Sequence, residues 1–234
     1  MHIIEESYLQ TFSHSLTLAY HRRILFTDFF SQSHIGTDSD RALLLDFQAT
    51  LEIKPEKAIK LEKDALAQIE NITADNARLV SNLHANLGGL YRMNGHPDLA
   101  REHMEKSISL LDQFNLLHIN DSIPQIANYA MFLTEQQEPE RGISELQKLS
   151  GIIKEYHSDH CLDYAKVQET LGTIYLMTAN LPQAKTHFKR AFKIYEKIWA
   201  DEPEMIKAKY QEIQELYPQI GFCIGKNLSG LLTK

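Results

Sequence analysis

The chain has 234 residues, of which 43% are hydrophobic and 24% are charged, as is usual for a globular protein that can bury a sizeable core. Its formal net charge of −7, without any block of Lys or Arg, argues against a general affinity for nucleic acid. Cysteines are too few for a disulfide framework, no apolar stretch approaches the roughly 20 residues that cross a bilayer, and the first residues do not resemble a signal peptide. We therefore expect a cytoplasmic protein with neither a nucleic-acid nor a membrane partner.

Residues 3–32 are predicted to form one long amphipathic helix. Apolar and aromatic side chains recur at helical spacing from Ile4 to Phe26, and neither Gly nor Pro interrupts the pattern. A helix this rich in aromatic residues needs a surface to cover, so we expect it to dock on the helices that follow. A helix that binds a partner or dimerises is the alternative.

The rest of the chain reads as a series of helices separated by short turns. Asp38-Ser39-Asp40 offers N-caps for the first of them. Gly95, Gln136 to Glu138, and Ala179-Asn180 mark later turns. Beyond residue 76 the predicted helices are 77–93, 97–114, 122–135, 139–156, 158–178, 182–199 and a last one that opens at Pro203.

A repeat of 42 residues organises this series. Leu87, Gly88 and Tyr91 recur 84 residues later, which is twice 42, and the helix that follows keeps the same step. The corresponding sets are Leu87/Tyr129/Leu171, Gly88/Ala130/Gly172, Tyr91/Leu133/Tyr175, Ala100/Gly142/Ala184 and Met104/Leu146/Phe188. Self-similarity at this period indicates stacked supersecondary units, in which the small residues lie where two helices cross closely.

These motifs resemble the tetratricopeptide repeat family, in which Leu-Gly-x2-Tyr is followed by Ala-x3-Phe. The family's Trp is replaced by His84 and Gln168, and the 42-residue length is similar to that of kinesin light chains and bacterial peptide-sensing regulators. The resemblance implies an all-α, right-handed superhelical solenoid of antiparallel helix pairs, with about three to four repeats and a C-terminal capping helix.

The predicted organisation has three parts. In the first repeat, Asp46 takes the place of the small glycine and Glu62 takes the place of Met104, so this repeat is degenerate. We have no assignment for the glycine-containing tail. The predicted parts are an N-terminal helix and linker (1–37), the repeats (38–200, divided into 38–75, 76–118, 119–157 and 158–200), and a capping helix and tail (201–234).

The resemblance places the first helix of each pair on a concave, ligand-facing side. Asn86 and Asn128 lie 42 residues apart there, and a carboxamide can both donate to and accept from a peptide backbone. Further candidates on this face are Thr170 in the same row, Arg92 and Lys166 for a carboxylate, and Met131, Thr173 and Met177 as an adaptable floor. The alternative is a solvated helix face, with Met177 in the core.

Other chemistry finds no matching pattern. His157, His160, Cys161 and Asp163 are metal-ligand types, but their spacing matches no structural zinc site and they stand where a helix begins. Gly221-x3-Gly225-Lys226 lacks the spacing and the Ser or Thr of a phosphate-binding loop. We predict no metal, no cofactor and no enzymatic activity.

The predicted function is therefore a non-catalytic scaffold or adaptor that binds an extended peptide or a partner helix in its groove. The alternative is a peptide-responsive regulatory sensor of bacterial type, although residues 1–40 show no DNA-binding helix-turn-helix. A hydrolase is a third reading without a supporting motif. The sequence identifies neither the partner nor the oligomeric state.

Overall fold

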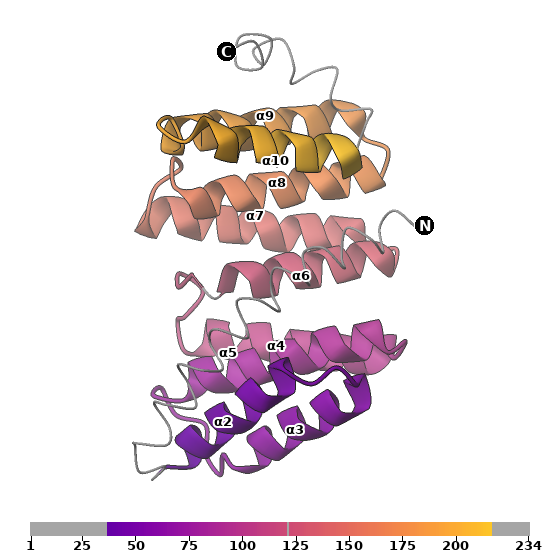
Figure 1. Cartoon of the computed structure of the whole chain (residues 1–234), viewed down its shortest axis with the longest axis vertical. Coiled ribbons are helices and arrows are strands. Elements are labelled where there is room, and N and C mark those ends of the chain that lie inside the picture. The colour runs from indigo at the N-terminus through magenta and orange to yellow at the C-terminus, as the bar shows by residue number, and fades with distance from the viewer. Residues whose placement is uncertain (1–36, 121, 217–234) are drawn as a thin grey trace. The chain divides into compact units, whose positions relative to one another are not determined.

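The computed structural model describes residues 37–120 and 122–216, in which all regular structure is α-helical (Figure 1). The predicted N-terminal helix and the tail lie outside these residues. The described helices are α2 (Asp38–Thr50), α3 (Pro55–Ala67), α4 (Ala77–Met93), α5 (Pro97–Gln113), α6 (Ser122–Glu135), α7 (Pro139–Tyr156), α8 (Leu162–Met177), α9 (Leu181–Ile198) and α10 (Pro203–Leu216).

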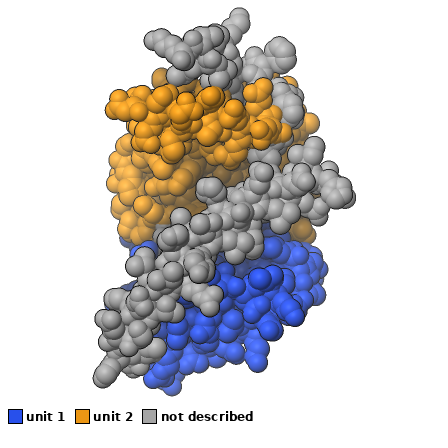
Figure 2. Space-filling model, in the orientation of Figure 1, with its two compact units in different colours: residues 1–116 blue, residues 117–234 orange. Residues whose placement is uncertain are grey.

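The chain divides into two compact units, residues 1–116 and 117–234 (Figure 2). The described part of unit 1 consists of the helix pairs α2/α3 and α4/α5, and α3 also packs against α4. Unit 2 contains the pairs α6/α7 and α8/α9, stacked in chain order, with α10 packed on α9 (Figure 1). The predicted all-α fold of paired helices is confirmed in the described residues.

Most helix ends follow the sequence signals. Proline stands in the first turn of α3, α5, α7 and α9, where its missing N–H has no helical partner to lose. Two starts differ from expectation. Thr37, rather than Asp38 to Asp40, is the N-cap of α2, because its side chain and that of Asp40 satisfy each other's backbone N–H groups. Helix α8 begins at Leu162 rather than near Ser158, since Cys161 caps it and its Sγ accepts the N–H of Tyr164 at 3.4 Å.

The turns within the helix pairs repeat one backbone conformation every 42 residues. Gly95, Gln137 and Ala179 have φ values of 74°, 65° and 58°, in the left-handed region. In each case the N–H of the next residue bonds the carbonyl five residues earlier, at 2.7–2.9 Å. Only glycine adopts this conformation without a steric cost at Cβ, so Gln137 and Ala179 are strained where Gly95 is not.

Small residues at the helix crossings have the predicted steric role. A Cβ on Gly88 would lie 2.6 Å from Cγ of Met104, and one on Gly172 would lie 2.9 Å from the ring of Phe188. Neither distance is compatible with the present packing. The glycine in the first helix of a pair therefore lets the large side chain of the second helix enter the core.

Candidate functional site

In unit 1, Asn86 is committed to contacts within the fold. It lies on α4, and its amide nitrogen donates to Oδ1 of Asp46 on α2 at 2.8 Å and to Oε1 of Glu62 on α3 at 3.1 Å. Both amide protons are thereby used within the unit. Only the carbonyl oxygen of Asn86 remains for the N–H of a bound peptide.

The same contacts explain the degenerate first repeat. Asp46 and Glu62 occupy the positions that Gly88 and Met104 hold in the next repeat, so a polar pair replaces a small residue and an apolar one. Glu62 is 1% exposed. Burial, followed by the charge of Asp46, raises the pKa of Glu62 to about 9, and burial also raises the pKa of Asp46. Glu62 is therefore protonated at neutral pH, and the Asn86 amide supplies donors to both acids.

In unit 2, the candidate residues lie on α6 and α8, which contact each other. Asn128 is exposed on α6, and Met131 is half-buried one turn later. Lys166 is exposed on α8 and lies 3.6 Å from the carboxylate of Asp163. An exposed pair of this kind contributes little to stability, so the Lys166 ammonium can change partners at small cost.

The remaining candidates on α8 are half-buried or exposed. Thr170 and Thr173 donate their hydroxyl protons to the carbonyls of Lys166 and Glu169, at 3.0 and 3.1 Å. Each hydroxyl oxygen keeps its capacity to accept a hydrogen bond. Met177 is 46% exposed, so it does not belong to the core. Arg92, the other predicted cation, is half-buried on α4 of unit 1.

Sequence reasoning did not find a polar cluster that joins the last three helices. Glu169 of α8 accepts a hydrogen bond from Tyr195 of α9 at 2.6 Å and pairs with Lys209 of α10 at 2.9 Å. Burial alone would lower the pKa of Lys209, but the carboxylates of Glu169 and Glu212 outweigh it and raise this pKa. The cluster ties α10 to the α8/α9 pair.

Buried imidazoles fill the place of the family's tryptophan. Nδ1 of His84 lies 2.8 Å from Nδ1 of His103, and at the equivalent position 84 residues later His187 Nδ1 lies 2.9 Å from Oε1 of Gln168. His103 stacks on Tyr91. Burial, with the neighbouring positive charges, lowers the pKa of His84 to about 4, so this ring is neutral at pH 7. The pairs have a packing role, and the 84-residue recurrence of the second histidine was the available signal.

The segment with metal-ligand types forms a turn and a helix cap. His157 Nε2 lies 2.9 Å from the carbonyl oxygen of His118, the ring of His160 contacts the carboxylate of Asp159, and Cys161 caps α8. Within residues 37–120 and 122–216, no three His, Cys, Asp or Glu side chains are grouped to hold a metal ion. Over the same residues, no helix is both long and apolar enough to cross a membrane.

The paired helices, the 42-residue step and the glycines at the crossings define an α-helical repeat protein. Residues 122–197 match the family model of the tetratricopeptide repeat, which confirms the predicted family for this segment. No curated protein sequence matches the chain significantly.

Two solved structures share the fold. One is BtubC (BKLC) from P. vanneervenii, with 18% sequence identity and a TM-score of 0.66, covering 94% of this chain and 88% of that one. The other is a variant of a putative kinesin light chain from Podosopora anserina with nearly identical TPR-like repeats, at 12% identity and a TM-score of 0.61, covering 76% and 85%. At these identities the likeness concerns the fold, and it supports a TPR-like repeat architecture.

Proposed function

We propose that the chain is a non-catalytic protein-interaction scaffold that binds an extended peptide on the α6 and α8 surface of unit 2. Stacked helical repeats present continuous rows of side chains to a partner, which is the usual use of this architecture. The observation that carries the proposal is the exposure of Asn128 on α6 beside Lys166 and Met177 on its neighbour α8.

The chemistry of this surface suits a peptide backbone of varied sequence. The Asn128 carboxamide can donate to a peptide carbonyl and accept from a peptide N–H, while the Thr170 and Thr173 oxygens can accept further N–H groups. Met131 and Met177 provide flexible apolar contacts, and Lys166 can pair with a carboxylate of the ligand. In unit 1, Asn86 through its carbonyl oxygen and Arg92 through its charge are a separate candidate contact.

Selection from a random displayed-peptide library, followed by calorimetric titration of the enriched peptide, tests this function. We expect Asn128→Ala to weaken binding roughly 2- to 12-fold, because one hydrogen bond contributes about 0.5–1.5 kcal/mol. Gln147→Ala on α7 is the matched control, since Gln147 is an exposed carboxamide on a second helix. Failure to enrich any peptide, or equal affinities of the Asn128 variant and the control, would remove this surface from the proposal.

A further inference from the structure

Unit 2 contains a pocket of about 450 Å³ whose lining comes from α7, the α7–α8 turn, α8 and α9. Lys154 near the end of α7 and three cations of α9 face it, with Tyr164 and Ile194 as the apolar part of the lining. The described lining residues are Lys154, Asp159, His160, Tyr164, Arg190, Lys193, Ile194 and Lys197.

The pocket is basic although the chain as a whole is acidic. Four of its side chains carry a positive charge and one, Asp159, a negative charge, which gives a formal local charge of +3 with His160 neutral. The whole chain has a formal net charge of −7. Asp159 contacts the ring of His160, so the one carboxylate of the described lining already has a neighbour.

The cations of α9 make no ion pair with another described residue, in contrast to lysines elsewhere in unit 2. Lys207 and Lys209 pair with Glu204 and Glu169, whereas Arg190, Lys193 and Lys197 are exposed without such a carboxylate. Like charges three and four residues apart on a helix repel each other, so this arrangement is unfavourable unless an anion relieves it. Lys154 Nζ lies 5.2 Å above the ring of Tyr164, which holds a fourth cation at the pocket.

We propose that this pocket binds an acidic peptide segment of a protein partner. Arg190 and Lys197 are seven residues apart, so their Cα atoms are separated by about 10.5 Å along the helix at 1.5 Å per residue. Four consecutive residues of an extended chain reach about 10 Å, so one short run of Asp or Glu matches the row. Charges spread over two helical turns suit several carboxylates in series better than a single phosphate group.

This site is independent of the proposed peptide surface. Its charged residues come from the second helices α7 and α9 and from the turn after α7, and none of them belongs to the α6 and α8 surface. The affinity of one site can therefore be changed by substitution without touching the side chains of the other.

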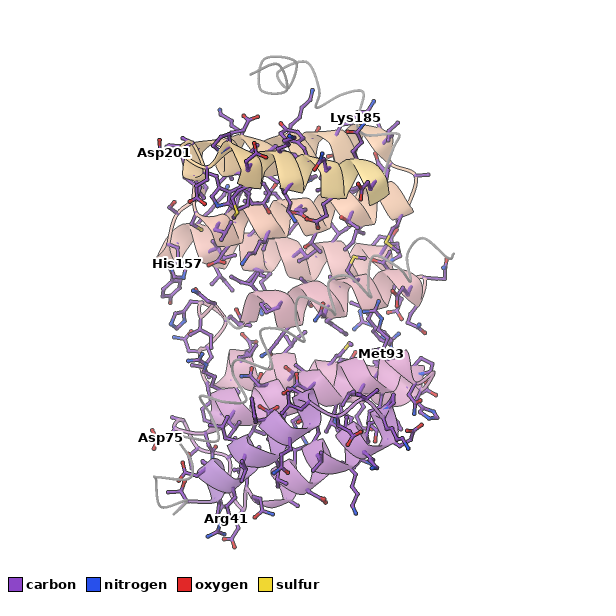
Figure 3. The ribbon with its side chains drawn as sticks, viewed as in Figure 1. Arg41, Asp75, Met93, His157, Lys185 and Asp201 are labelled. Carbon is purple, nitrogen blue, oxygen red and sulfur yellow. The ribbon has the colours of Figure 1, made fainter. Side chains whose placement is uncertain are left out.

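Fluorescence anisotropy of a labelled hexaglutamate peptide, titrated with the full chain at low salt, tests the inference. We expect Lys193→Ala/Lys197→Ala to weaken binding roughly 5- to 30-fold, as expected for the loss of two exposed ion pairs. The matched control is Lys185→Ala/Lys189→Ala, which removes the same charge from α9 at residues outside the pocket lining. Figure 3 shows Lys185 at the end of unit 2 opposite to His157 of the α7–α8 turn. We expect this control to bind within about 2-fold of the wild type, with circular dichroism showing that both variants are folded.

Three results would overturn the inference. Undetectable binding of hexaglutamate to the wild type would mean that the pocket is not an acidic-peptide site. Equal weakening in both double variants would show a response to net charge alone. Tighter binding of tripolyphosphate than of hexaglutamate, lost in the Lys193/Lys197 variant, would assign the pocket to a phosphate ligand instead.

Discussion

The buried acid Glu62 makes the stability of unit 1 depend on pH, and Glu62→Gln is the substitution that exposes this dependence. The folded-state pKa of Glu62 is about 9, against an ordinary value of 4.5. Between these values the folded chain keeps a proton that the unfolded chain releases, so stability falls as pH rises. The full shift corresponds to about 6 kcal/mol as an upper limit, at 1.36 kcal/mol per pH unit.

Glutamine keeps the shape of the protonated acid and cannot ionise. At pH 4 the wild type and Glu62→Gln are therefore expected to unfold with similar free energies, because Glu62 is then protonated in both the folded and unfolded states. At pH 8 we expect the variant to be more stable by about 2–5 kcal/mol, measured by urea denaturation followed by circular dichroism.

The difference between wild type and variant isolates Glu62, because the other titrating groups are common to both chains. Glu56→Gln on the same helix is the control, since Glu56 is exposed and we expect its substitution to give no comparable pH-dependent difference. A wild-type-minus-variant difference that stays constant from pH 5 to pH 9 would refute the assignment of a raised pKa to Glu62.

Two further predictions concern the glycine positions. Gly88→Ala should lower the free energy of unfolding by about 1–3 kcal/mol, since its Cβ would meet Met104, whereas Gly89→Ala, with open space around it, should raise it by about 0.5–1 kcal/mol; thermal melts of this adjacent pair check the packing, and equal melting temperatures would contradict it. Ala179→Gly should stabilise the chain by about 1 kcal/mol by relieving the left-handed strain, and Gly95→Ala should destabilise it by a similar amount; denaturant unfolding that moves both variants in the same direction would contradict this account.

Local signals were enough to predict the helix pairs. The 42-residue step, the prolines of the first turns and the turn at Gly95 act within a few residues of one another, so the bounds of α4 and α7 agree with the predicted ones. The displaced starts of α2 and α8 depend on which of several neighbouring side chains forms the cap. That choice is settled by hydrogen-bond geometry, to which residue type is only a guide.

The candidate sites depended on contacts between helices far apart in the chain. Asn86 fits the predicted ladder by spacing, yet its amide protons are taken by acids 40 and 24 residues away, a pairing that no periodicity announces. The pocket similarly combines Lys154 with the cations of α9, which in sequence are ordinary surface charges. The sequence by itself therefore determined the repeat and its helices, because these follow from local propensity and from the spacing of apolar and small residues. Only the tertiary structure decided which polar groups are buried, paired or left to face a partner, because burial and charge pairing are set by neighbours that the fold brings together.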